Sequence, residues 1–146
     1  MSHVEGCSAC EIVRGTRQTP GGILLRRDGF AVHAVAAPSP LPGWLVLTSE
    51  RHARAIYELD VDESAALGQL MAEVMRAQRE ALGAEHVYAF QIADQVQHCH
   101  VHLVPRFADT PDRLRGTRCF DARPEDAITA ATLAEAAVAV RRKLAP

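Results

Sequence analysis

Three histidines, His98, His100 and His102, alternate with apolar residues near the last third of the chain. Alternate residues of a β-strand lie on the same face, so the pattern predicts three imidazoles on one side, about 6.6 Å apart per pair. The residues between them would point into the core. This spacing of a single chemically active residue type makes the segment the first candidate for a functional site.

Two kinds of chemistry fit three clustered imidazoles. An unprotonated imidazole can attack phosphorus near neutral pH, while its neighbours carry positive charge or protons toward the phosphate and the leaving group. Alternatively, two of the histidines could bind a catalytic metal, because residues i and i+2 of a strand can share one ion. The residues alone leave both possibilities open.

Cys7 and Cys10 have the Cys-x2-Cys spacing with which two thiolates bind zinc, a site that needs two further ligands. Two cysteines without a ligand are the simpler alternative. A thioredoxin-like redox pair is disfavoured, since that motif lies at a strand-to-helix junction and the sequence predicts none around Cys7. We therefore expect a metal-binding pair rather than part of a disulfide framework.

The composition bounds the class of protein. The chain has 146 residues, of which 48% are apolar, and this fits one domain over 1–146 with a sizeable core. Sixteen basic and 18 acidic residues leave a net charge of -2, which argues against a nucleic-acid partner. No apolar run is long enough for a membrane span, and no apolar leader precedes Gly15, so we expect a cytoplasmic protein without a membrane partner.

The order of the strands and helices expected around these residues indicates an α+β fold, with a five-stranded antiparallel sheet and two main helices. A helix is expected to begin after Asp60, which forms a capping box with Glu63, and to end at Gly83. A second helix is expected to begin near Pro124. Strands are expected over 23–27, 30–35, 44–47, 87–92 and 99–104, with Pro105 ending the last one.

The motifs together resemble the histidine triad (HIT) superfamily, in its zinc-binding bacterial form. The segment from His98 to Pro105 matches the histidine triad signature, and Cys7–Ile12 resembles the Cys-x-x-Cys start of many bacterial members. The segment Pro42–Leu47, followed by His52, resembles their central strand and the histidine after it. The resemblance covers about 7–111 and implies a HIT-like fold.

The resemblance also implies a reaction. His100 would attack the α-phosphorus of a nucleotide-like substrate, and water would release the nucleotide from the covalent nucleotidyl-histidine. His102 would lie beside the phosphate and the leaving group, and His98 would orient the site or bind metal. The expected enzyme hydrolyses phosphoanhydride or phosphoramidate bonds, in dinucleoside polyphosphates or nucleoside phosphoramidates. The alternatives are nucleotidyl transfer or phosphorolysis, and a nucleotide-binding sensor with little turnover.

Further site residues and partners follow from the same resemblance. Zinc would be structural and bound by Cys7, Cys10, His52 and His98, with no catalytic metal, and the protein would be a homodimer. Gln95 and Gln91 are candidate phosphate donors, and Ile12 aligns with an apolar wall of the base pocket.

Three parts of the sequence depart from the family pattern or fall outside it. Ala36 stands where members place an acidic or amide side chain on the ribose, and Trp44 stands where many have histidine. We expect Trp44 to pack in the core. The irregular segment 106–123 carries several arginines, Arg113 and Arg115 among them, and is expected to shape the leaving-group side of the site.

Overall fold

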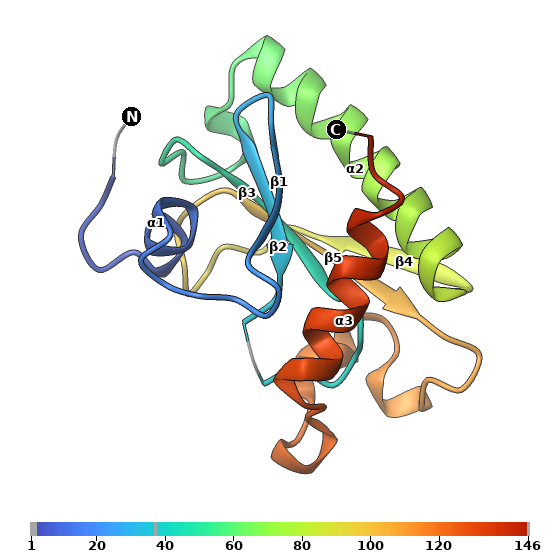
Figure 1. The fold of residues 1–146 in the computed structure, drawn as a ribbon. Coiled ribbons are helices and arrows are strands. Elements are labelled where there is room, and N and C mark those ends of the chain that lie inside the picture. Colours follow the sequence, from blue (N-terminus) through green and yellow to red (C-terminus); the bar gives the residue numbers. More distant parts are fainter. Residues whose placement is uncertain (1–2, 37, 146) are drawn as a thin grey trace.

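Five strands form one antiparallel sheet in the order β1-β2-β3-β5-β4, and three α-helices accompany it (Figure 1). The computed structural model describes residues 3–36 and 38–145; Met1, Ser2, Ala37 and Pro146, which belong to the predicted domain 1–146, lie outside the described residues. The elements are α1 (Ser8–Arg14), β1 (Ile23–Arg27), β2 (Phe30–Ala34), β3 (Leu45–Ser49), α2 (Val61–Leu82), β4 (His86–Phe90), β5 (His100–Arg106) and α3 (Ala130–Arg141). This architecture confirms the predicted α+β class and its five-stranded sheet.

Local sequence signals explain where the main elements begin and end. Asp60 caps α2: its side chain accepts from the Glu63 N–H, and the Glu63 side chain accepts from the Asp60 N–H. Gly83 ends the helix in the left-handed region at φ 72°. Asp28 and Gly29 both have positive φ in the tight turn between β1 and β2, which the right-handed twist of a two-residue hairpin requires.

The two long helices cover one face of the sheet. In Figure 1, α2 and α3 lie side by side, with α2 against β4 and β5 and α3 against β1 and β2. Val101 and Leu103 of β5 point into the core between sheet and helices, together with Leu70, Val74 and Val140. Because successive side chains of a strand alternate between faces, His100 and His102 lie on the face away from these helices.

Two expectations about element boundaries were wrong, and one short helix was missed. Strand β5 continues through Pro105 to Arg106. Proline is tolerated there because β3 pairs with β5 only as far as Leu103, so residue 105 has a strand on one side alone. The last helix begins at Ala130, capped by Thr129, whereas Pro124 opens a short 3-10 turn. The seven-residue helix α1 was not predicted.

Among the described residues, no helix combines the length and the apolar character needed to cross a membrane.

Candidate functional site

Four predicted metal ligands meet although they come from three distant parts of the chain. Cys7 caps the N-terminus of α1, and Cys10 lies in the first turn of that helix. His52 follows β3, and His98 precedes β5. The ligand atoms of all four residues lie within 4.8 Å of one another. We call this group the Cys/His cluster.

The distances in the Cys/His cluster fit a tetrahedral metal. His98 Nδ1 lies 3.6 Å from Cys7 Sγ and 3.5 Å from Cys10 Sγ, and His52 Nδ1 lies 3.3 Å from Cys10 Sγ. Ordinary zinc–sulfur and zinc–nitrogen bonds at tetrahedral angles place sulfur and nitrogen about 3.6 Å apart. The cluster therefore has the donor types and the spacing of a closed Cys2His2 site.

The neighbours of His98 select the nitrogen that faces the sulfurs. His98 Nε2 lies 2.7 Å from the Ser49 carbonyl oxygen, which can only accept, so Nε2 carries a proton. In the neutral ring Nδ1 is then an unprotonated lone pair directed at the cysteines. Burial lowers the pKa of His98, which favours this neutral form, and burial with the adjacent Cys7 raises the pKa of the Cys10 thiol. A cation at this position would offset the effect of burial on Cys10, because metal binding favours the thiolate form.

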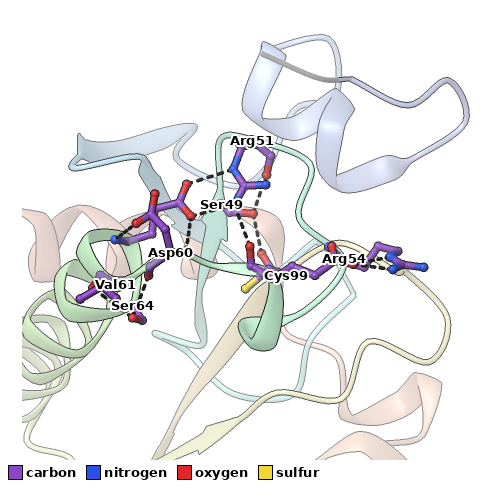
Figure 2. Close-up of polar contacts among 9 residues, drawn as sticks. Ser49, Arg51, Arg54, Asp60, Val61, Ser64 and Cys99 are labelled. Carbon is purple, nitrogen blue, oxygen red and sulfur yellow. Dashed lines mark hydrogen bonds and ion pairs between the residues drawn. The ribbon is translucent and has the colours of Figure 1, made fainter.

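A polar network holds the loop that carries His52 against the segment that carries His98 (Figure 2). The Ser49 hydroxyl lies 2.7 Å from the Arg51 carbonyl and 3.3 Å from the Cys99 carbonyl. The Cys99 N–H donates to the Ala53 carbonyl at 2.6 Å. Arg51 reaches across to Glu63 on α2 with two hydrogen bonds, of 3.0 and 2.7 Å. These bonds position two of the four ligands of the Cys/His cluster.

A separate cavity of about 580 Å³ lies beside β5. His100 and His102 line it, together with Gln95 of the loop before β5 and with Trp44 and Phe120. Among its described lining residues Asp94 is the only acidic one, and none is an arginine or a lysine. We call this space the histidine cavity; it can hold a small molecule against two imidazoles.

The backbone sets the protonation pattern of His100. His100 Nδ1 lies 2.5 Å from the His98 carbonyl oxygen, and a carbonyl accepts only, so Nδ1 carries a proton. In the neutral ring Nε2 is then an unprotonated nitrogen with a free lone pair. This is the form of imidazole that can act as a nucleophile or a base.

His102 has the opposite arrangement. Its Nδ1 accepts a hydrogen bond of 3.0 Å from the indole N–H of Trp44. Burial, together with the neighbouring His100 and His33, lowers the pKa of His102 to about 4. The rings of His100 and His102 meet edge to face with centroids 5.1 Å apart. The two imidazoles that line the histidine cavity therefore have their backbone or side-chain partner on Nδ1, but Nδ1 donates in His100 and accepts in His102.

The three histidines do not share one face as expected. The strand begins at His100, and the His98 side chain turns to the Cys/His cluster, so only its carbonyl faces His100. A metal bound by the ring of His98 would therefore belong to the Cys/His cluster. Within the described part of the chain, the one group of metal-ligating side chains that was found includes neither His100 nor His102.

The structure places the three predicted substrate-binding residues at different positions. Gln95 lines the histidine cavity, but Gln91 and Ile12 do not. Gln91 lies at another cavity with Arg54, and its Nε2 has no partner among the described residues. Ile12 is buried in α1. The assignment of Gln91 and Ile12 to substrate binding stays a prediction that the cavity does not support.

The segment 106–123 reaches the histidine cavity, but through different residues than expected. Cys119 and Phe120 line the cavity. Arg113 instead pairs with Asp126, and Arg115 bonds to the Thr110 and Ala108 carbonyls. Neither arginine lines the cavity, and a leaving-group role for them stays a prediction. Sequence reasoning missed Phe120 because an isolated aromatic residue in an irregular segment carries no periodic signal.

Solved structures share this fold. A Hit-like protein involved in cell-cycle regulation from Bartonella henselae is 16% identical with a TM-score of 0.75, over 99% of this chain and 100% of that one. A Zn-bound histidine triad family protein from Mycobacterium smegmatis is 21% identical with a TM-score of 0.71, over 94% and 92%. A HIT family hydrolase from Clostridium thermocellum is 19% identical with a TM-score of 0.56, over 75% and 97%.

No family model and no curated protein matches the sequence. The likeness in structure nevertheless extends over nearly the whole chain. The described residues thus have the fold of the histidine triad proteins.

Proposed function

We propose that this protein is a nucleotide phosphohydrolase that acts through a covalent nucleotidyl-histidine at His100. The observation that carries the proposal is the 2.5 Å contact between His100 Nδ1 and the His98 carbonyl, which leaves Nε2 of the neutral ring free to attack. His100 lines a cavity large enough for a nucleotide-sized ligand. A HIT family hydrolase of the same fold supports the reaction class.

The reaction has two displacements at phosphorus. In the first, a bond forms between His100 Nε2 and the α-phosphorus, and the bond from phosphorus to the leaving group breaks. The leaving group takes the electron pair of that bond. In the second, water attacks the phosphorus, the phosphorus–nitrogen bond breaks and the nucleoside monophosphate leaves, while the proton of water passes to solvent. His102 and Gln95 lie in the same cavity and can donate hydrogen bonds to phosphoryl oxygens.

We also propose that the Cys/His cluster holds a structural zinc ion. The sulfur–nitrogen distances of 3.3 to 3.6 Å fit tetrahedral zinc, and the M. smegmatis protein of this fold is Zn-bound. Bound there, zinc would supply a crosslink between α1, the loop after β3 and the start of β5. The four ligands fill a closed site, which is the arrangement of structural rather than catalytic zinc.

A panel of adenylyl and guanylyl phosphoramidates and dinucleoside polyphosphates tests the reaction. Turnover of any member, together with a labelled nucleotidyl adduct on acid-quenched protein, would support hydrolysis through His100. If the nucleotide were released only to an acceptor other than water, the protein would be a transferase or phosphorylase. Tight binding without adduct or turnover would instead indicate a nucleotide-binding sensor, for which Ala36 in place of a ribose-binding side chain is the supporting feature.

The homodimer stays part of the proposal. Strand β4 forms one edge of the sheet, with β5 on its other side, so its outer backbone groups are available for a second copy. Light scattering on the eluted protein should give a mass of two chains. A single-chain mass at micromolar concentration would contradict this part and leave the chemistry at His100 unaffected.

A further inference from the structure

The indole nitrogen is the only polar atom of the Trp44 side chain, and it contacts His102 in the histidine cavity. Its indole Nε1 lies 3.0 Å from His102 Nδ1. An indole N–H donates and never accepts, so His102 Nδ1 must be the acceptor and cannot carry a proton. The direction of this hydrogen bond is fixed, because an imidazole nitrogen can donate or accept whereas the indole nitrogen can only donate. The proton of neutral His102 therefore lies on Nε2.

A buried glutamine side chain holds together the two backbone segments that carry Trp44 and His102. Gln78 of α2, which is fully buried, donates from Nε2 to the Gly43 carbonyl at 2.8 Å and to the Leu103 carbonyl at 2.9 Å. Gly43 precedes Trp44, and Leu103 follows His102. One side chain thus fixes the spacing of the two segments that carry the donor and the acceptor.

Gly43 allows the close approach of this segment to α2. It has a φ of 78°, and a Cβ there would lie 2.1 Å from Leu82 Cδ1, so a larger residue would push the segment away. The indole is 5% exposed and meets Phe120 edge to face at 5.2 Å. The indole that donates to His102 is therefore enclosed by the fold on the side away from the cavity opening and packed against Phe120.

The surroundings of His102 also disfavour a second proton. His100 on the same strand and His33 on β2 are the titratable groups that act on it, and both oppose a positive charge. Cys119 and Asp94 line the same cavity, but neither is a hydrogen-bond partner of the ring among the described residues. Protonating Nδ1 would break the bond from Trp44 and leave two N–H donors facing each other.

We propose that Trp44 is a positioning residue that holds His102 as a neutral imidazole with its proton on Nε2, so that His102 donates a hydrogen bond to the phosphoryl group and does not protonate the leaving group. The assignment of the tautomer stands by itself. The consequence for the leaving group rests on the proposed function of His100.

This tautomer selects a class of substrate. A neutral imidazole does not give up its remaining proton near neutral pH, so the leaving group departs from phosphorus with the bond electrons and takes any proton from solvent. Phenolates, carboxylates and phosphates are stable when they leave in this way. An amine must gain a proton on nitrogen before it leaves, so phosphoramidates of alkylamines should be poor substrates.

Nuclear magnetic resonance of the 15N-labelled, metal-loaded protein tests the tautomer without any substrate. In the wild type we expect His102 Nδ1 to resonate as an unprotonated ring nitrogen and Nε2 as a protonated one, from pH 8 down to below pH 5. Loss of one ring from the spectrum of His102→Gln identifies the signals. A proton on Nδ1 of His102 at neutral pH would overturn the proposal, whatever the variants show.

Two variants separate the indole donor from the aromatic packing. Trp44→Phe removes the donor, and we expect His102 to populate both tautomers and to protonate at a higher pH than in the wild type. Phe120→Leu is the matched control, since Phe120 touches both Trp44 and His102 edge to face without a hydrogen bond. It should keep the wild-type signals. The same signals in Trp44→Phe as in the wild type would contradict a role for the indole.

Kinetics test the consequence for the leaving group. We compare two adenylyl substrates, a p-nitrophenyl ester and an alkylamine phosphoramidate. The wild type should prefer the ester, and Trp44→Phe should lower the ratio of the two kcat/KM values by about tenfold or more as His102 gains an acid form. An unchanged ratio would contradict the consequence. Turnover of neither substrate by the wild type would count against the proposed function, while the resonance result on Trp44 would still stand.

Discussion

The Cys/His cluster and the histidine cavity use the same residue type, but the partner that fixes the free nitrogen differs from ring to ring. In the cluster, the Ser49 carbonyl accepts a hydrogen bond from His98 Nε2–H, which leaves Nδ1 for the sulfurs. In the cavity, the His98 carbonyl accepts a hydrogen bond from His100 Nδ1–H, which leaves Nε2 free in the neutral ring. At His102, Trp44 donates to Nδ1 and leaves a proton on Nε2.

The difference shows that the neighbour of a histidine, and not the histidine motif, decides what its ring can do. A carbonyl beside one nitrogen makes the other a lone pair, which can bind metal or attack phosphorus. An N–H donor beside one nitrogen makes the other a hydrogen-bond donor. His98 links the two regions, because its ring belongs to the cluster while its carbonyl orients His100.

The largest effect is expected from His100→Asn. The amide of asparagine can still donate to the His98 carbonyl, so the fold should persist, but the nucleophile is lost. We expect kcat/KM to fall at least about a thousandfold, which is about 4 kcal/mol in activation free energy. His86→Asn, at an exposed position of β4, is the control and should keep wild-type turnover. Turnover within tenfold of the wild type in His100→Asn would rule out the covalent route.

Cys10→Ser should act on the other region, through the fold. It removes a ligand of the Cys/His cluster, so elemental analysis should find the metal lost and the free energy of unfolding lower by at least about 3 kcal/mol. Cys119→Ser is the matched control, because both side chains are 1% exposed and only Cys10 belongs to the cluster. Equal metal content and equal stability in the two variants would contradict the metal site.

We expect acid to lower the free energy of unfolding through His33, a buried histidine of β2. This histidine is 2% exposed, and its ring bonds to the Ala34 carbonyl and to the Thr48 hydroxyl, each at 2.8 Å. Burial lowers its pKa from the ordinary 6.5 to about 4. The unfolded chain then binds a proton that the folded chain does not, so the contribution of His33 to stability is full above pH 6.5 and is lost as the pH drops toward 4, by about 3 kcal/mol.

Denaturant unfolding between pH 8 and pH 4 measures this loss, with His33→Asn as the comparison. The variant should be less stable at pH 7, since it loses the bond to Thr48, but its stability should fall less steeply with acid. Any release of metal at low pH should affect the wild type and His33→Asn equally. Identical slopes for the two proteins would show that His33 does not carry the pH dependence.

The smallest effect is expected from Ser49→Ala, which tests the connection between the regions. The variant loses the hydroxyl contacts to the Arg51 and Cys99 carbonyls but keeps the Ser49 carbonyl that orients His98 (Figure 2). We expect a loss of about 1 kcal/mol with the metal retained. Ser64→Ala, whose hydroxyl bonds to the Asp60 carbonyl on an exposed helix start, should change stability by less. Metal loss in Ser49→Ala would show that the hydroxyl matters more than the carbonyl.

The local parts of the fold were predictable because their signals lie within a few residues. The capping box of Asp60 and Glu63, the stop at Gly83 and the turn at Asp28 each depend on bonds or dihedral angles inside one turn. The start of the last helix was not predictable from Pro124. Ser39 pairs there with Ile128, a contact across the fold that keeps the chain extended until Thr129.

The candidate sites also have features that the sequence predicted and features that it did not. The identities and spacing of the cysteines and histidines, read beside a family resemblance, predicted the four members of the Cys/His cluster. They also predicted that His98 would share a face with His100 and His102, and this was wrong because the contacts of His98 with Cys7 and Cys10 depend on where α1 packs against the sheet. Phe120 and the pairing of Arg113 with Asp126 likewise depend on how the irregular segment folds back.

The sequence by itself determined which side chains were available for chemistry and that His100 and His102 would lie on one strand, because residue type and short-range periodicity are written in the chain. Only the tertiary structure decided which nitrogen of each imidazole is free. That choice depends on a single acceptor or donor at hydrogen-bond distance, and for His102 the donor is Trp44, 58 residues away in the sequence. A contact over that separation is set by the packing of β3 against β5 and by no local pattern.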